Sequence, residues 1–148
     1  MLIEQQNYTI MQALYQATAT ATGGRNGQVK SSDGVLDLEV RMPKELGGTG
    51  GAFTNPEQLF AAGYSACFDS ALNLVIRMQK ITTGPTTVTA EVSIGKNDAG
   101  GFGLATTLKV HIPGVEREVA QALVEKAHEV CPYSNATRGN MPVTLEII

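Results

Sequence analysis

Hydrophobic and polar positions alternate along the N-terminal third of the chain. Residues 15–22 (YQATATAT) place Tyr and Ala on one face and Gln and Thr on the other, and residues 35–42 (VLDLEVRM) alternate again. A period of two is typical of a strand with one buried face. A further strand over 28–32 is bounded by the turn signals GGRNG, at 23–27, and Asp33-Gly34. The pattern therefore predicts three strands before the first helix.

The period changes to that of a helix after Asn55. Asn55 suits the N-cap, Pro56 the first helical position and Gln58 the capping-box position. From there to about Lys80 the sequence is mostly apolar, with a narrow stripe of polar side chains at every fourth position: Ser65, Asp69, Asn73 and Arg77. This composition predicts a long helix that protein covers on nearly all sides.

Two strands, a second helix and a last strand complete the chain. Residues 86–94 and 104–112 are predicted as strands, and 143–148 as the last one. The helix that starts near Val115 should end at Cys131, because the residue before Pro132 is pushed out of the helical region. The order βββ-α-ββ-α-β is that of an α+β protein. We predict a single domain over residues 1–148, since neither a linker nor an internal repeat interrupts it.

Composition and charge narrow the classes of function. The 148 residues are enough to bury a core without a crosslink, and a net charge of -3 offers no basic face to nucleic acid. The first 12 residues lack the cationic lead and apolar run of a secretory signal, and no run approaches the ~20 apolar residues of a membrane span. We therefore expect a soluble cytoplasmic protein that binds neither nucleic acid nor membrane.

Two chemical motifs are incomplete in this chain. The glycine-rich stretch 47–51 (GGTGG) lacks the Gly-Lys-Ser/Thr of a phosphate-binding loop and the Rossmann spacing. His128 and Cys131 share a helix face, but His111 lies in a predicted strand and no Cys-x-x-Cys occurs. We therefore expect a flexible loop at 47–51, no metal site, no cofactor, and both histidines on the surface.

The two cysteines remain as candidates for chemistry. In a cytosolic protein a cysteine pair is more often catalytic or metal-binding than a permanent crosslink. At about 100° per residue, Cys67 lies about 200° from Ser65 and Asp69, so its thiol faces away from the polar stripe. Free cysteine is also among the most buried residue types. The residues alone therefore do not distinguish a reactive Cys67 from one that only packs in the core.

The sequences around both cysteines resemble a known family. TNPEQLFAAGYSACF and CPYSNATRGN, together with ATATGGRNG and SSDGVLDLEVRMPKELGG, closely resemble the organic hydroperoxide resistance (Ohr) proteins, a branch of the OsmC-like family. The resemblance extends from about Tyr15 to the C-terminus. It implies an OsmC-like fold in which antiparallel sheets wrap around long central helices of an intertwined homodimer.

The resemblance also implies an enzyme, a thiol-dependent peroxidase that reduces organic hydroperoxides to alcohols. It makes Cys67 the peroxidatic cysteine and Cys131 the resolving cysteine, with Arg25 of TGGR and Glu57 of NPEQ completing the site. Cys67 would become a sulfenic acid, which Cys131 condenses into a disulfide. Regeneration needs a dithiol, and the resemblance implies dihydrolipoamide carried on a lipoylated partner protein.

Electrostatics assigns roles to the two charged residues. Burial raises the pKa of a cysteine, whereas the thiolate is the reactive form. A cation about 4 Å away at an effective dielectric of ~20 contributes about 4 kcal/mol, so Arg25 can offset burial. Glu57 would raise the pKa of Cys67, and we expect it instead to fix the guanidinium. Without the resemblance, Arg25 is a solvated turn residue and Glu57 a carboxylate favoured by the helix N-terminus.

Spacing along the first helix predicts how the site is assembled. Glu57 and Cys67 are separated by about 15 Å along the helix axis and cannot meet within it. We therefore predict that two copies of the helix run antiparallel across a dimer interface, so that Glu57 and Arg25 of one chain approach Cys67 of the other. Apolar residues at helical spacings from Cys67 predict an apolar entrance for alkyl and fatty-acid hydroperoxides. These residues are Phe60, Tyr64, Ala71 and Leu74.

A hypothesis from a different class of function also fits these residues. A non-catalytic protein of the same fold could bind apolar ligands or sense redox state through the same pair of cysteines.

Overall fold

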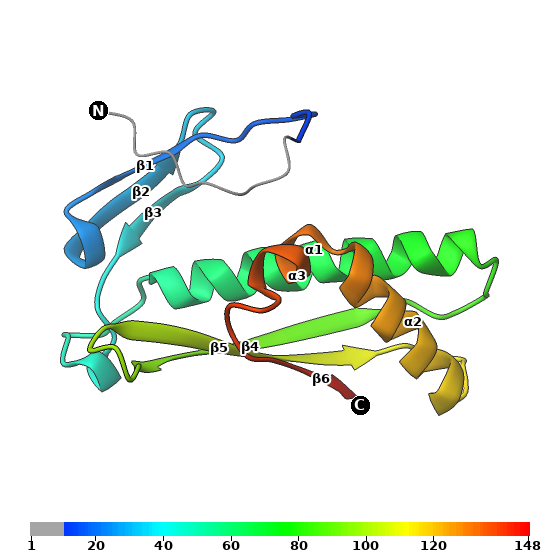
Figure 1. Cartoon of the computed structure of the whole chain (residues 1–148). Coiled ribbons are helices and arrows are strands. Elements are labelled where there is room, and N and C mark those ends of the chain that lie inside the picture. Colours follow the sequence, from blue (N-terminus) through cyan, green and yellow to red (C-terminus); the bar gives the residue numbers. More distant parts are fainter. Residues whose placement is uncertain (1–10) are drawn as a thin grey trace. The chain divides into compact units, whose positions relative to one another are not determined.

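Two three-stranded sheets and three α-helices make up the structure, a computed structural model that describes residues 11–148 (Figure 1). This is the α+β class that the sequence predicts. Contacts divide the chain into two units, residues 1–53 and 54–148, which we describe in turn. The segment predicted to lack a secretory signal lies outside the described residues, except for Met11 and Gln12. The single domain stays a prediction.

The N-terminal unit is an antiparallel sheet of order β1-β2-β3. Its elements are β1 (Ala19–Thr22), the 3₁₀ turn η1 (Gly24–Asn26), β2 (Gly27–Ser31), β3 (Asp37–Val40) and the 3₁₀ turn η2 (Lys44–Leu46). Val29 of β2 lies opposite both Ala21 and Leu38. The outer strands are shorter than predicted, and the apolar residues at their predicted ends are exposed, Tyr15 by 84% and Val35 by 82%.

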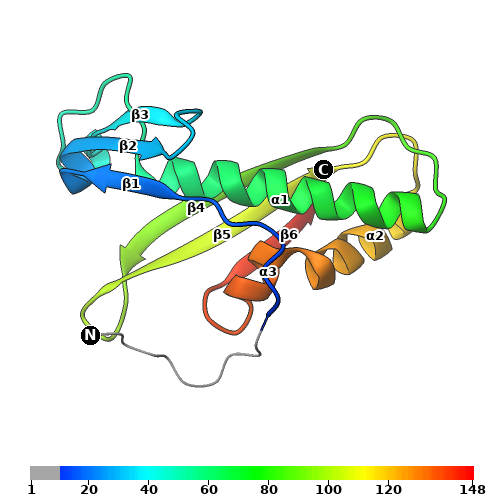
Figure 2. The same ribbon diagram turned by 90° about the horizontal axis from the view of Figure 1, so that it is seen from above.

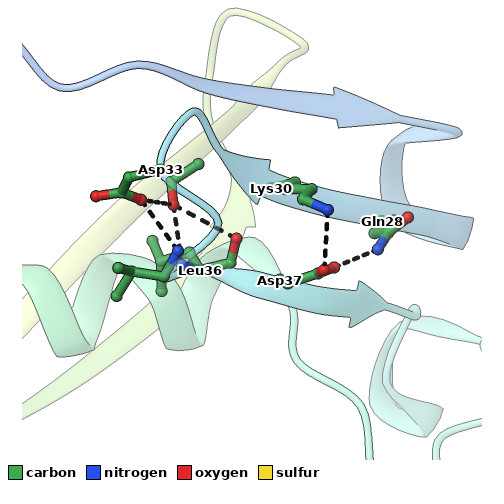
Figure 3. A network of polar contacts seen from close by, with 7 residues as sticks. Gln28, Lys30, Asp33, Leu36 and Asp37 are labelled. Atoms are coloured by element: carbon green, nitrogen blue, oxygen red, sulfur yellow. Dashed lines mark hydrogen bonds and ion pairs between the residues drawn. The ribbon is translucent and has the colours of Figure 1, made fainter.

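A polar network fixes the turn between β2 and β3 (Figure 3). Asp33 accepts the Ser31 hydroxyl at 2.5 Å and the backbone N–H of Val35 at 3.0 Å. Gly34 has a φ of 75°, in the left-handed region that favours glycine. The Asp33-Gly34 turn signal is thus confirmed. Across the two strands, Asp37 contacts Gln28 and Lys30.

The C-terminal unit places its helices on one face of the second sheet (Figures 1 and 2). Its elements are α1 (Pro56–Met78), β4 (Thr87–Lys96), β5 (Phe102–His111), α2 (Arg117–Val130), α3 (Pro132–Thr137) and β6 (Val143–Ile147). α1 packs on β4 and on α2, and α2 also contacts β6. The core lies between these helices and the sheet. Its fully buried large side chains include Tyr64, Phe68, Leu72, Leu108 and Leu123.

The second sheet is mixed, so the prediction of antiparallel sheets is wrong for one strand pair. β4 and β5 form an antiparallel hairpin in which Thr87 lies opposite His111. β5 and β6 run parallel, with Leu108 opposite Leu145. Parallel neighbours need a crossover between them, and α2 with α3 provides it. The crossover is what brings the second cysteine back over α1.

α1 starts as the sequence predicts and ends at Met78. The Asn55 side chain accepts the N–H of Gln58 at 2.8 Å, and Pro56 occupies the first turn. By length and composition α1 could cross a membrane, so the prediction that no segment approaches that limit was too strict. Its buried face, which includes Phe68, forms part of the core of this unit.

Two side chains of the polar stripe of α1, Asp69 and Asn73, are half-buried, whereas Arg77 is exposed. Asn73 donates to the Thr86 hydroxyl at 2.9 Å, and Thr86 donates to Asp69 at 2.5 Å, so these side chains join α1 to the segment before β4. Leu74 is 44% exposed and Met78 is 72% exposed. Within one chain, α1 is therefore not covered on nearly all sides as predicted.

A short helix follows the second cysteine and was not predicted. α2 ends at Val130 as Pro132 requires, and Cys131 has an extended backbone (φ −66°, ψ 122°). Pro132 then occupies the first turn of α3, where its missing N–H is not needed. Cys131 therefore lies at the junction of two helices.

Candidate active site

The structure brings Cys67 and Cys131 together. Cys67 lies on α1 and Cys131 at the α2–α3 junction, and their Sγ atoms are 3.7 Å apart with neither in a disulfide. A disulfide bond is about 2.05 Å long, so a small movement of the junction is enough to join the two sulfurs. The crossover between β5 and β6 thus places two residues far apart in sequence in direct contact.

The two sulfurs have different surroundings. Cys131 is 0% exposed and belongs to the core. Cys67 is half-buried and packs against the edge of that core. The thiol of Cys67 therefore faces inward as the sequence predicts, but it keeps contact with solvent. Of the two residues, Cys67 is the one that keeps part of its surface exposed.

Burial raises the pKa of the Cys67 thiol above its ordinary value. The backbone N–H of Tyr133 acts in the opposite direction, because it donates a hydrogen bond to the sulfur. The neighbouring Cys131 thiol raises the pKa of Cys67 as well, since two negative sulfurs would repel. One neutral donor does not offset these effects. A thiolate at Cys67 near neutral pH therefore requires a cationic group beside it.

Arg25 and Glu57 lie in different units of the chain. Arg25 is half-buried in η1 of the N-terminal unit, and Glu57 is half-buried in the first turn of α1. Both side chains have interaction partners. The approach of these two residues to Cys67 stays a prediction.

The four predicted substrate contacts differ in exposure. Tyr64 and Ala71 are buried in the core, with 0% and 7% of their surfaces exposed, whereas Leu74 is 44% exposed. Phe60 is half-buried and borders a cavity of about 760 Å³, which the turn of the β4–β5 hairpin and the segment after α3 also line. Phe60 and Leu74 are thus the two within reach of solvent. Contact of any of the four with a substrate stays a prediction.

Tyr133 is a residue of the site that the sequence analysis missed. Its ring lies over Gly63 of α1, where an added Cβ would come within 2.7 Å of the tyrosine hydroxyl. The same ring is 5.7 Å from that of Tyr64 and 6.3 Å from that of Phe60. Gly63 lies one turn before Cys67, so this glycine lets α3 approach α1 where the sulfurs meet. A glycine inside a helix was the available signal, since it often marks a close approach.

A chain of buried hydrogen bonds lies beside Cys131. His128 Nδ1 is 2.8 Å from Ser134 Oγ, which is 2.9 Å from the Tyr64 hydroxyl. That hydroxyl is 3.1 Å from Thr137 Oγ1, which donates to the Ser134 carbonyl at 3.2 Å. The prediction of a surface His128 is therefore wrong, because the side chain is half-buried against α3. Burial, with the nearby charge of Arg138, lowers the pKa of His128.

The remaining predicted features lie at the surface. His111 is exposed on β5, and its Nδ1 is 2.9 Å from the Ile148 carbonyl oxygen. Residues 47–51 form a loop, as expected.

Over residues 11–148, no group of three or more His, Cys, Asp or Glu side chains is arranged to hold a metal ion.

Comparison with known proteins gives consistent matches along the chain. A family model described as OsmC-like protein matches residues 48–146. The organic hydroperoxide resistance protein of Xanthomonas axonopodis pv. citri is 53% identical over 135 residues, which are 90% of this chain and 94% of that protein. The organic hydroperoxide resistance protein OhrA of Bacillus subtilis is 54% identical over 142 residues, 92% of this chain and 97% of that one.

Solved structures agree with these matches. The crystal structure of an organic hydroperoxide resistance protein from Elizabethkingia anophelis superposes with a TM-score of 0.89 at 66% identity, and the match covers 93% of this chain and 98% of that chain. That of OhrB from Bacillus subtilis has a TM-score of 0.83 at 50% identity, covering 92% of this chain and 100% of that chain.

Proposed function

Because this chain belongs to the OsmC-like family and its relatives are organic hydroperoxide resistance proteins, we propose that it is a thiol-dependent peroxidase that reduces organic hydroperoxides to alcohols. The similarity supports a role in organic hydroperoxide resistance. One observation supports the step from that role to cysteine chemistry. Two free sulfurs lie 3.7 Å apart, one within reach of solvent and the other fully buried.

The reaction begins at Cys67. Its thiolate attacks the terminal oxygen of the hydroperoxide, so an S–O bond forms, the O–O bond breaks, and the alkoxide leaves and takes up a proton to become the alcohol. The sulfur loses two electrons and becomes a sulfenic acid. The Cys131 thiol then displaces water from this sulfenic acid and forms the Cys67–Cys131 disulfide. An external dithiol reduces the disulfide by exchange and is itself oxidised to a disulfide.

Arg25 supplies the positive charge that this first step needs. Burial raises the pKa of Cys67, and a guanidinium within hydrogen-bonding distance would lower it again by stabilising the thiolate. Glu57 orients that guanidinium through a bidentate pair and does not contact the sulfur.

The complete site is formed by two copies of the chain. The exposed apolar residues of α1, Leu74 and Met78, and those of the N-terminal unit, Tyr15 and Val35, favour cover by a second copy. In the proposed homodimer, Arg25 and Glu57 of one chain approach Cys67 of the other.

The substrate is an alkyl or fatty-acid hydroperoxide, whose apolar part lies against Phe60 and the cavity that it borders. Bulky hydroperoxides should therefore outcompete hydrogen peroxide. The reductant is dihydrolipoamide, carried on a lipoylated protein, as the resemblance to the Ohr branch implies.

A peroxide-consumption assay tests the proposal. With dithiothreitol or dihydrolipoamide as reductant, the purified protein should consume cumene hydroperoxide faster than hydrogen peroxide, and Cys67→Ser should abolish turnover. Cys131→Ser should keep one round of oxidation at Cys67 and lose the disulfide. Thiol titration after one equivalent of hydroperoxide should show the loss of two thiols per chain in the wild type. Unchanged consumption by Cys67→Ser would contradict catalysis by Cys67, and wild-type consumption no faster than that of the reductant alone would favour the non-catalytic alternative.

A further inference from the structure

A chain of side-chain hydrogen bonds ties the α2–α3 junction to α1. It starts at His128 in the last turn of α2, passes through Ser134 of α3 and Tyr64 of α1, and returns to α3 at Thr137. Tyr64 and Ser134 have no exposed surface and Thr137 has 5%. Cys131 lies between His128 and Ser134 in the sequence. These hydrogen bonds therefore hold the backbone on both sides of Cys131, the residue whose sulfur lies next to that of Cys67.

When all four contacts carry a proton, the number of available protons sets the direction of these hydrogen bonds. Each hydroxyl group can donate once, and a carbonyl oxygen can only accept. Thr137 must therefore be the donor in its 3.2 Å contact with the Ser134 carbonyl. Because that proton is then used, Tyr64 must donate to Thr137, and Ser134 must donate to Tyr64. His128 must in turn donate to Ser134 from Nδ1.

The opposite direction leaves one contact without a proton. If Ser134 donated to His128, Tyr64 would donate to Ser134 and Thr137 to Tyr64. The Thr137 hydroxyl oxygen would then face the Ser134 carbonyl oxygen at 3.2 Å with no proton between them. The Ser134 carbonyl accepts the Arg138 backbone N–H at 2.9 Å in either arrangement, so neither direction leaves it without a partner. The first direction is favoured because it places a proton in one more contact.

We propose that His128 is a positioning residue for the cysteine pair, because its Nδ1–H starts a one-way hydrogen-bond chain that holds Cys131 within reach of Cys67. His128 touches neither sulfur in this role and acts through Ser134. Its contribution to the resolving step rests on the proposed peroxidase function. The direction of the hydrogen bonds is independent of that function.

Nitrogen-15 NMR of the histidine rings tests the direction without any activity. The chain has two histidines, so His111→Gln leaves His128 as the single signal. In the reduced protein at neutral pH we expect a proton on Nδ1 and none on Nε2. Ser134→Ala removes the acceptor and should weaken this preference. A proton on Nε2 with a bare Nδ1 in the wild type would overturn the proposal.

The pair His128→Asn and His128→Asp tests the role in positioning. The two new side chains have nearly the same size, but only asparagine can donate an N–H to Ser134. After one equivalent of cumene hydroperoxide, dimedone trapping follows the conversion of the Cys67 sulfenic acid into the disulfide. We expect this step within about threefold of wild type for asparagine and slowed about tenfold or more for aspartate, the order expected when a buried hydroxyl loses its donor.

Controls separate the possible outcomes. His111→Asn and His111→Asp, at an exposed position on β5, should give equal rates. If His128→Asp does not fold, Tyr64→Phe removes one hydroxyl from the middle of the chain and should slow the same step. Equal rates for the two His128 variants, or an unchanged rate for Tyr64→Phe, would overturn the positioning role. A wild type that forms no sulfenic acid would instead contradict the proposed function, while the NMR result would still decide the direction.

Discussion

The reactivity of Cys67 depends on a few neighbouring groups. Burial and the adjacent Cys131 thiol raise its pKa, and the hydrogen bond from the Tyr133 backbone N–H lowers it. The resemblance of the motifs predicts that the two sulfurs pair, and they lie 3.7 Å apart as free thiols, so the disulfide stays a prediction. The Tyr133 donor could not be predicted, because it depends on α3 and on how that helix approaches α1.

Removing the guanidinium should shift the pH dependence of Cys67. The thiolate fraction grows as pH rises through the pKa, and loss of a nearby cation raises the pKa. Arg25→Ala should therefore move the half-maximal rate of single-turnover oxidation about one pH unit or more toward alkaline pH. The rate of cumene hydroperoxide reduction against pH, in the Cys131→Ser background, measures this. Lys30→Ala, which removes an exposed cation of the same unit, is the control and should leave the profile in place.

His128 should make the protein less stable in mild acid. Burial first, and then the charge of Arg138, lower its pKa in the folded state from 6.5. As pH falls through about 6.5 the unfolded chain takes up the proton before the folded one does, so the stabilisation is complete above that pH and is lost below it. Urea unfolding at pH of about 7 and about 5.5 should show a smaller loss for His128→Asn than for the wild type. An equal loss would contradict this account.

The partners of His128 could not be predicted from spacing. Its place on a helix indicates only which face it shares, and its contacts come from the next helix, which the sequence pattern did not reveal. Tyr64 was assigned to a substrate entrance for a related reason. Its apolar ring fits the helical pattern, whereas its hydroxyl is bound to Ser134 and Thr137.

At the scale of elements, local signals predicted helix α1 better than the helices and strands around it. Its start depends on Asn55 and Pro56, which act within one turn. α3 and the parallel pairing of β6 depend instead on where the crossover returns to the sheet, and no local pattern encodes that. The outer strands of the first sheet are shorter than their alternation predicts, which leaves Tyr15 and Val35 uncovered within one chain.

Oxidation should join two helical elements and stabilise the fold. A Cys67–Cys131 disulfide would link residues 64 positions apart and close a long loop in the unfolded chain. Loop entropy of that size corresponds to about 4 kcal/mol. Oxidised protein should therefore unfold at higher urea concentration than reduced protein, and Cys131→Ser should show no such difference between oxidising and reducing conditions. A less stable oxidised form would indicate that joining the sulfurs distorts the α2–α3 junction.

At the scale of the whole molecule, the fold class and the family follow from the sequence, while the assembly of the site does not. The motifs around the two cysteines and in the N-terminal strands indicate the OsmC-like family, which the comparisons show. Arg25 belongs to the N-terminal unit and Cys67 to the C-terminal unit, so the chain order does not decide whether one chain or two complete the site.

Mixing two impaired variants tests the shared site, at a pH below both midpoints, where a shift of one pH unit leaves Arg25→Ala about a tenth of the wild-type thiolate. If Arg25 of one chain serves Cys67 of the other, a heterodimer of Arg25→Ala and Cys67→Ser chains contains one intact site. Random exchange of subunits should then restore about a quarter of wild-type peroxidase activity, since half of the dimers have one of their two sites. Sites within single chains would give no recovery, because every site would carry one defect. Ultracentrifugation of the mixture verifies that dimers form and exchange.

Gly63 and Tyr133 restrict each other's evolution. With an added Cβ only 2.7 Å from the tyrosine hydroxyl, position 63 has no room for a side chain while the ring stays where it is. We expect related proteins that carry a larger residue at the position of Gly63 to carry a smaller one at that of Tyr133. The two positions should therefore covary across the family.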